Sequence, residues 1–253
     1  MDQRDRRESA DNITKVIDWL ITSEQTAVFT GAGISVDSGI PTFRGENGLW
    51  EKYDPALLTL DYFYRNPEES WQLLLEIYRV INKAQPNQAH MVLAEMEEEG
   101  FIDQIITQNI DNLHQKAGSK NVYEFHGNYL KLVCLDCDQK MQVEDLEDNL
   151  DEIPPLCDRC DGVLKPDIVF FGEGIPTDVY EKAYVVAEKA ELFIIIGTSG
   201  EVAPANLIPR RAKNTGAKIV EITPEPTQYS EEISDIVIYG NARGALIELW
   251  DFL

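Results

Sequence analysis

Short apolar runs alternate along the chain with segments in which apolar residues recur every three or four positions. Runs of the first kind are typical of buried strands, and segments of the second kind of helices packed on one face. The predicted strands cover residues 26–30, 101–107, 122–125, 167–172, 192–197, 218–222 and 236–239. The predicted helices cover residues 11–22, 86–100, 111–117, 177–190, 204–214 and 242–252.

Individual residues indicate the buried face of two of these helices and the ends of one. The first places an apolar stripe on one face, made of Ile13, Val16, Ile17, Leu20 and Ile21. The second begins at Pro86–Asn87, carries Val92, Leu93 and Met96 on its apolar face, and stops at Gly100. Strands that alternate with helices predict an α/β fold, with a mostly parallel sheet covered on both faces.

Residues 131–163 interrupt this alternation with paired cysteines, many acids and two consecutive prolines, so we interpret them as an inserted module. Cys134 and Cys137 form one C-x2-C pair, and Cys157 and Cys160 form a second pair 19 residues later. Two such turns can close a tetrahedral thiolate shell around structural Zn²⁺. The alternatives are two redox pairs or an iron–sulfur site.

The composition narrows the partners of the protein. Among 253 residues, 45 acidic and 22 basic side chains give a formal charge of −23, which opposes direct nucleic-acid binding and favours a basic protein or peptide. Acidity for solubility, or for a high-salt habitat, is an equally open interpretation. No apolar run is long enough to span a membrane, and the N-terminal residues lack the apolar region of a secretory signal, so we expect a cytoplasmic protein.

A glycine-rich turn follows the first predicted strand at Gly31, Ala32 and Gly33. Such a turn lets backbone amides approach a pyrophosphate, although a tight strand–helix connection explains the same residues. The segment 41–45, with Phe43 and Arg44, can cover a bound nucleotide as a lid or be an ordinary surface loop.

Polar residues follow three further predicted strands, where ligands bind in open parallel sheets. They are Gln108, Asn109 and Asp111 with Ile110 between them, His126, and the run Gly197, Thr198 and Ser199. A histidine at a strand end can act as a general base near neutral pH. His90 and His114 fall inside predicted helices, where packing or surface roles are expected.

Taken together, six segments resemble the sirtuin family of NAD-dependent protein deacylases. They are GAGISVDSGIPTFRG (31–45), TQNIDNLHQKAG (107–118), FHGN (125–128), the four cysteines, PDIVFFGE (166–173) and GTSGEVAPA (197–205). The resemblance implies a Rossmann-like large domain (about 1–40, 86–130 and 164–253). It also implies a small domain made of a helical segment (about 41–85) and the zinc ribbon (about 131–163).

The resemblance also implies roles for single residues. The NAD co-substrate would contact Gly31, Ala32, Gly33, Phe43, Arg44, Gln108, Asn109, Ile110, Asp111, Gly197, Thr198, Ser199 and Thr223. Asn109 and Asp111 would grip the nicotinamide carboxamide, and His126 would be the catalytic base. The acyl-lysine substrate would lie against Val169, Phe170, Phe171 and Gly172. The family usually has asparagine where this chain has Thr223, so the adenosine-side contact differs.

The implied reaction converts acyl-lysine protein and NAD into lysine, nicotinamide and an O-acyl-ADP-ribose. Members that remove succinyl or malonyl groups carry a tyrosine and an arginine where alignment on Trp71 places Leu74 and Ile77. An apolar pocket disfavours a carboxylate, so we expect neutral acyl groups, with acetyl first. The alternatives are transfer of ADP-ribose to protein, and a non-catalytic NAD sensor or adaptor.

Overall fold

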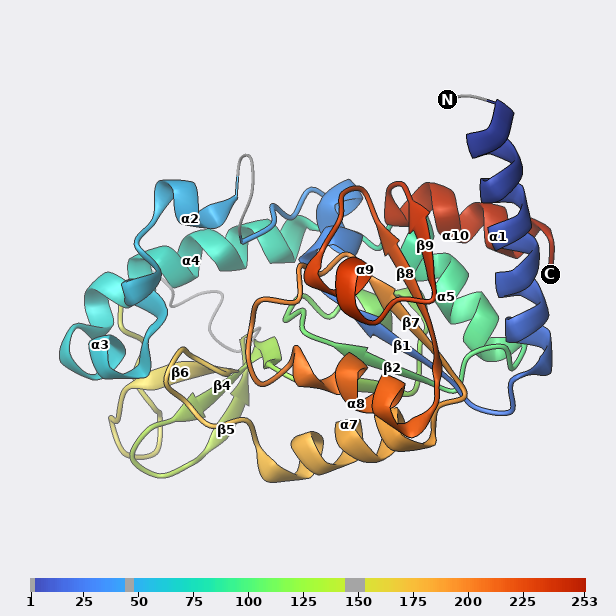
Figure 1. Ribbon diagram of the computed structural model, residues 1–253. Coiled ribbons are helices and arrows are strands. Elements are labelled where there is room, and N and C mark those ends of the chain that lie inside the picture. Colours follow the sequence, from blue (N-terminus) through green and yellow to red (C-terminus); the bar gives the residue numbers. More distant parts are fainter. Residues whose placement is uncertain (1–2, 44–47, 144–152) are drawn as a thin grey trace.

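The computed structural model describes residues 3–43, 48–143 and 153–253, with side chains from residue 11 onward. Two sheets organise this part of the chain (Figure 1). The six-stranded sheet has the order β3-β2-β1-β7-β8-β9, and all of its neighbouring strands are parallel. Its strands are β1 (Thr26–Thr30), β2 (Gln104–Thr107), β3 (Val122–Glu124), β7 (Leu192–Ile196), β8 (Lys218–Thr223) and β9 (Ile236–Tyr239).

Helices cover both faces of this sheet because its central strands are apolar on both sides. On β1, Val28 faces one buried cluster, whereas Ala27 and Phe29 face the other. The first cluster is covered by α1 (Gln3–Thr22), α5 (Gln88–Glu98) and α10 (Ala242–Asp251). The second is covered by α7 (Thr177–Lys189), α8 (Leu207–Thr215) and α9 (Gln228–Glu232). The predicted α/β fold with a parallel sheet is confirmed.

A three-stranded antiparallel sheet stands beside the large one, in the order β5-β4-β6 (Figure 1). Its strands are β4 (Gly127–Cys134), β5 (Lys140–Gln142) and β6 (Leu164–Ile168). The helical segment between residues 49 and 83 packs on it and contains α2 (Leu49–Lys52), η2 (Pro55–Leu58), α3 (Leu60–Arg65) and α4 (Pro67–Lys83). The Trp71 indole donates a hydrogen bond of 2.9 Å to the carbonyl of Leu164, joining α4 to β6.

Three sequence predictions need correction. The strand expected over 101–107 begins only at Gln104, because the amides of Phe101 and Ile102 bond to the carbonyl of Met96 and close the end of α5. The strand expected over 167–172 lies at 164–168 instead, and it pairs with β4 rather than joining the parallel sheet. Ile21, expected on the buried stripe of the first helix, is 60% exposed.

Other elements shift less or were not predicted. The helix expected at 204–214 begins at Leu207, and the one expected at 111–117 is α6 (Leu113–Ala117). Helix α9 and the bounds of α4 were not predicted. Residues 127–130 and 164–168, which the resemblance assigns to the large domain, lie in the three-stranded sheet. No helix in the described part of the chain combines the length and the apolar character that crossing a membrane requires.

Candidate active site

A cavity of about 310 Å³ opens where the carboxyl ends of β1, β2 and β7 face the segment after β6. Parallel strands present their following loops at one edge, so residues far apart in the sequence meet there. The predicted residues that line this cavity are Gly31, Ala32, Gly33, Phe43, Gln108, Asn109, Ile110, His126, Val169, Phe170, Phe171, Gly172, Gly197, Thr198 and Ser199. Arg44 lies outside the described residues, and Asp111 and Thr223 are not among the lining residues.

The glycine-rich turn and the end of β7 interlock backbone against backbone. The amide of Gly33 donates to the carbonyl of Gly197 at 2.9 Å, and a Cβ on Gly33 would lie 2.6 Å from the Gly197 Cα. A Cβ on Gly197, where φ is +62°, would lie 2.7 Å from the amide nitrogen of Ile34. The need for a tight connection between strand and helix therefore explains these glycines without a bound phosphate. The same contacts place the ends of β1 and β7 side by side.

Gln108 and Asn109 tie the end of β2 to the ends of β1 and β7. The Gln108 amide donates to the Thr198 hydroxyl at 2.9 Å. The Asn109 amide donates to the carbonyl of Gly31 and to the hydroxyl of Ser35, both at 3.1 Å. These bonds fix both amide side chains at the cavity wall, because each donor has a partner on a neighbouring strand end.

Asp111 is buried directly behind the cavity wall. Its carboxylate accepts the Ser35 hydroxyl at 2.7 Å and the Leu113 amide at 3.0 Å. Burial raises the pKa of Asp111, while these two hydrogen bonds oppose the rise. The Ser35 hydroxyl also lies 3.4 Å from Nε2 of His90. Asp111 thus belongs to a buried network that orients Asn109.

The network gives His90 and His114 interior roles. His90 Nδ1 accepts the Asn87 amide, so its Nε2 carries the proton and donates to Ser35. The rings of His90 and His114 meet edge to face at 5.0 Å. Burial lowers the pKa of His90 to about 4 and that of His114 well below its usual value, so both stay neutral. The packing role expected for them agrees with this burial, whereas a surface role does not.

Ser35 was missed by sequence reasoning, although it lies within the GAGIS motif that was singled out. It is fully buried on the short 3₁₀ helix η1 (Ala32–Ser38). A buried hydroxyl that contacts an acid, an amide and a histidine can be found only once the three strand ends are placed together. The sequence signal was limited to a serine directly after a glycine-rich turn.

His126 stands between the two sides of the cavity. Its Nδ1 lies 3.1 Å from the carbonyl of Gln108, and its own carbonyl accepts the Val169 amide at 2.9 Å. If Nδ1 donates to that carbonyl, Nε2 is left as the basic nitrogen. Burial lowers the pKa of His126, and the Gln108 carbonyl partly opposes this. The ring is therefore neutral near pH 7, as a general base requires.

Aromatic rings form the opposite wall. The rings of Phe43 and Trp50 lie 5.5 Å apart, and those of Trp50 and Phe171 lie 6.1 Å apart. Phe171 is 40% exposed, and its backbone bonds to Leu58 and Leu60 at 2.9 and 3.0 Å. The amides of residues 169–171 all bond within the chain, so a peptide strand pairing here would need other groups.

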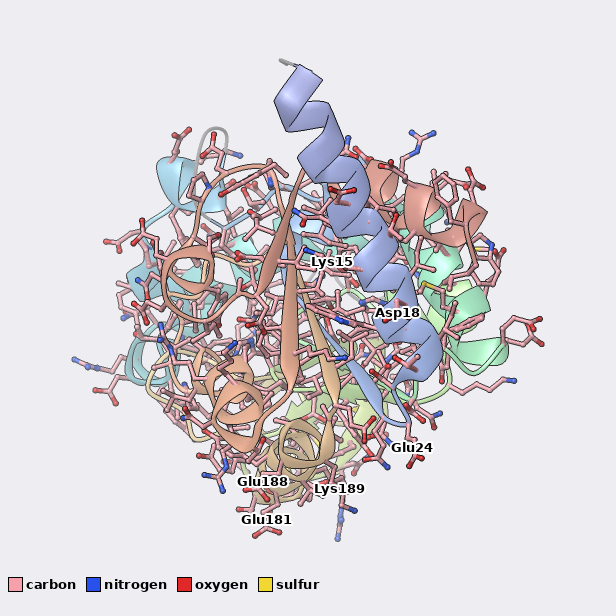
Figure 2. The ribbon with its side chains drawn as sticks, turned by 45° about the vertical axis from the view of Figure 1, so that its right-hand side comes forward. Lys15, Asp18, Glu24, Glu181, Glu188 and Lys189 are labelled. Atoms are coloured by element: carbon pink, nitrogen blue, oxygen red, sulfur yellow. The ribbon has the colours of Figure 1, made fainter. Side chains whose placement is uncertain are left out.

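A second cavity, of about 500 Å³, lies at the opposite end of the strands, between α7 and the start of β1 and β2. Its charged residues include Asp103, Glu181 and Lys189. Figure 2 shows Glu181 and Lys189 at the outer edge of the molecule with other exposed charges. None of the predicted site residues lines this second cavity, whereas fifteen of them line the first.

Comparison with known proteins decides the family. The model of the Sir2 family matches residues 31–204, which is more than half of the chain. The chain belongs to the Sir2 family. An "NAD-dependent protein deacylase" from Aeropyrum pernix is 46% identical over 212 residues, covering 83% of this chain and 85% of the relative. An "NAD-dependent protein deacetylase 1" from Pyrobaculum aerophilum is 43% identical over 245 residues, covering 97% and 96%.

Solved structures agree with this assignment. A Sir2 complex described as "Sir2-p53 peptide-NAD+" superposes with a TM-score of 0.88 at 38% identity, covering 95% of this chain and 98% of that one. The resemblance to sirtuins is confirmed, and so is the expected class, an NAD-dependent protein deacylase. The individual roles assigned to site residues stay predictions.

The four cysteines of this Sir2-family chain converge as predicted. All four sulfur atoms lie within 4.8 Å of one another, with Cys134 and Cys160 at 3.5 Å and Cys137 and Cys157 at 3.8 Å. A tetrahedral Zn²⁺ with bonds of about 2.3 Å needs sulfur atoms about 3.8 Å apart, so the cluster fits structural zinc. A shell of four thiolates leaves no position for a reacting water.

Two positions behave differently from the expectation for this sirtuin. Of the two aligned acyl-selectivity positions, Ile77 lines the cavity, whereas Leu74 is fully buried in the packing behind it. Thr223 is buried, and its hydroxyl donates to the carbonyl of Glu225 at 2.7 Å. That hydroxyl is already used within the chain, so it offers no free donor to an adenosine ribose.

Proposed function

We propose that the 310 Å³ cavity is the active site at which this sirtuin removes acyl groups, acetyl first, from lysine side chains with NAD as co-substrate. The observation that carries the proposal is the convergence of His126, Asn109 and the segment 169–172 on one cavity, with Asp111 directly behind it. These are the residue types that the reaction needs, brought together from three separate parts of the chain.

The large-sheet side of the cavity would hold NAD. The residues proposed for this are Gly31, Ala32, Gly33, Phe43, Arg44, Gln108, Asn109, Ile110, Asp111, Gly197, Thr198 and Ser199. NAD supplies an anomeric carbon with nicotinamide as leaving group. The chain's task is to orient that carbon toward the acyl oxygen and to exclude water from the site.

His126 is proposed as the base that accepts a proton from a ribose hydroxyl. Its neutral ring is fixed by the Gln108 carbonyl, which leaves the second nitrogen available to the cavity. Asn109 and Asp111 are proposed to bind the carboxamide of the leaving group. Ser35 supports both of them, because its hydroxyl bonds to each.

The acyl-lysine would enter along Val169, Phe170, Phe171 and Gly172. Ile77 contributes an apolar side chain to this part of the cavity. It disfavours a carboxylate on the acyl group, because no lysine or arginine among the described residues lines the cavity to compensate the lost hydration. The formal charge of −23 supports a basic protein or peptide as substrate. The complex of a Sir2 protein with a p53 peptide supports a peptide in this cleft.

The four-cysteine module is proposed to have a structural role only, holding the strands next to residues 169–173. Four reduced thiolates suit a reducing compartment, which supports a cytoplasmic location. We also propose a division into a large domain (about 1–40, 86–130 and 164–253) and a small one (41–85 with 131–163), with residues 127–130 and 164–168 moved to the small domain because they complete its sheet. A shared apolar cluster between the helical segment and the ribbon supports this division.

The test is mass spectrometry of acetyl-lysine and succinyl-lysine peptides incubated with purified protein, with and without NAD. We expect NAD-dependent loss of acetyl and much slower loss of succinyl. Faster cleavage of the succinyl peptide would contradict the assigned acyl preference. A peptide that gains the mass of ADP-ribose would favour the transferase alternative, and NAD binding without turnover would favour the sensor alternative.

A further inference from the structure

A buried lysine lies beneath the segment proposed to hold the acyl-lysine. Lys165 is on β6, and its side chain is only 3% exposed. Its ammonium donates to the carbonyls of Pro166 and Ile168 at 3.1 and 2.6 Å and to the Glu173 carboxylate at 3.1 Å. An ammonium has three N–H donors, so this set satisfies all of them.

Glu173 connects this lysine to the cavity. The same oxygen, Oε2, that receives the ammonium also accepts the amide of Phe170 at 2.9 Å, and the Glu173 amide donates to the Phe170 carbonyl at 3.0 Å. The ammonium also lies 4.4 Å above the Phe170 ring, within range of a cation–π contact. One charge pair therefore holds both the backbone and the ring of Phe170, which lines the cavity.

We infer that Lys165 and Glu173 are positioning residues, which set the shape of the acyl-lysine side of the cavity by holding the turn 169–173. The inference rests on the proposed function of that cavity. Lys165 does not line the cavity, so it acts through Phe170 rather than by touching the substrate. Glu173 lies at the cavity wall, and its carboxylate holds the Phe170 amide there. A buried charge pair gives a turn little net stability, because desolvating the two charges costs free energy and apolar residues of similar size often stabilise the fold as well. Its retention here is explained by the specific backbone groups that it fixes.

The test separates positioning from plain stability with two variants. Lys165→Met leaves Glu173 without its cation, and we expect lower thermal stability together with a rise of about tenfold in KM for an acetyl-lysine peptide. The double variant Lys165→Met with Glu173→Leu leaves no unpaired charge, so its thermal stability should return toward that of the wild type. Its peptide KM should stay raised, because Glu173→Leu takes away the acceptor of the Phe170 amide.

Lys140→Met is the matched control. Lys140 lies on β5 of the same sheet and pairs with Asp167 of β6 at 2.8 Å, but its side chain is 67% exposed. We expect its peptide KM to stay within about twofold of the wild type, as for exposed ion pairs in general. In all three variants, KM for NAD should also stay within about twofold, because the turn lies on the other side of the cavity.

The results are decisive in either direction. Recovery of peptide KM together with thermal stability in the double variant would overturn the inference and leave the pair a purely structural one. An equal rise of KM for NAD and for peptide in Lys165→Met would overturn it as well. If the wild-type protein removes no acyl group, the proposed function itself fails. If it is active and neither Lys165 variant changes peptide KM, only the present inference fails.

Discussion

The strands beneath the two sides of the cleft have contrasting environments. We call residues 31–33, 108–111 and 197–199 the NAD side, and residues 169–173 with their aromatic neighbours the peptide side. Below the NAD side, all five side chains of β1 and all five of β7 are buried. Below the peptide side, four of the five side chains of β6 are buried, but none of the edge strand β5 is, and one end of the three-stranded sheet closes on four cysteines.

The difference lies in what supplies the stability. Burial of apolar surface gives roughly 25 cal/mol per Å² and needs long apolar strands, which the large sheet has. The ribbon has no such core of its own: its buried residues share one apolar cluster with the helical segment 49–83, and metal binding can supply further folding free energy. One cleft therefore depends on two sources of stability, and each side should fail under different conditions.

Removal of the metal is expected to have the largest effect. Cys157→Ser takes away a buried thiolate, and zinc contributes about 10–16 kcal/mol to the folding of small zinc domains. We expect loss of bound zinc, loss of deacylation and an early thermal transition of the ribbon, while the large sheet melts later. Zinc content by elemental mass spectrometry and melting by circular dichroism check this. A single shared transition would show that the two sides do not fold separately.

His126 bonds to both sides, so its replacement should stop the reaction without separating them. We expect His126→Tyr to lower kcat by about 10²- to 10⁴-fold, as for the loss of a general base. Calorimetry should still detect NAD binding, and melting should be little changed. Deacylation at the wild-type rate in this variant would refute the assignment of the base.

Ser35→Ala should weaken the NAD side alone. It removes the hydroxyl that Asp111 accepts and leaves a buried acid short of a donor, which costs about 1–3 kcal/mol of folding free energy. KM for NAD should rise, and KM for peptide should not. Val36→Ala, at a neighbouring residue that is 49% exposed, is the control. A rise in peptide KM of the same size would mean that the two sides are coupled through η1.

The pH profile probes the junction between the two sides. Burial lowers the pKa of His126 from its usual value of 6.5, and the base works only when neutral. Activity should therefore persist as the pH falls and disappear only as it passes through the lowered pKa, so the acid limb of kcat/KM lies below pH 6.5. A midpoint above 6.5 would contradict this, because it would require a partner that favours the charged ring.

Thr223→Val should have the smallest effect. It removes a hydroxyl that bonds within the chain, so we expect a loss of about 1 kcal/mol in the free energy of unfolding and a KM for NAD within about twofold of the wild type. Chemical denaturation and NAD titration measure the two. A clear rise in KM for NAD would show that the Thr223 hydroxyl contributes to NAD binding.

The sequence predicted the large sheet better than the small one, for a physical reason. A uniform apolar run such as 192–197 predicts a strand that is buried on both faces. A glycine such as Gly100 predicts the end of a helix without any distant partner. The run 167–172 is also mostly apolar, but its backbone bonds to His126, Leu58 and the Glu173 carboxylate rather than to the large sheet. Those partners are distant in the sequence or compete locally, and periodicity does not reveal them.

The same limit applies to the site. Motif resemblance identified most of the cavity wall, including His126 and Asn109. It did not identify Ser35 or Lys165, because neither acts alone. Ser35 bonds to Asp111 and Asn109, and Lys165 bonds to Glu173, which in turn holds Phe170. The resemblance-based assignment of Thr223 to the co-substrate contacts stays a prediction, and the Thr223 hydroxyl bonds to the Glu225 carbonyl. Supporting residues of this kind become visible only in three dimensions.

The interlock of Gly33 and Gly197 has a consequence for how this protein can change over evolutionary time. Each glycine occupies space that a methyl group on the other would need, so a substitution at one cannot be rescued by any residue at the other. Neither Gly33 nor Gly197 can therefore be replaced by a residue with a side chain without moving the backbone. We therefore expect both glycines to be retained, and variation in co-substrate handling to arise in the loops next to the crossing.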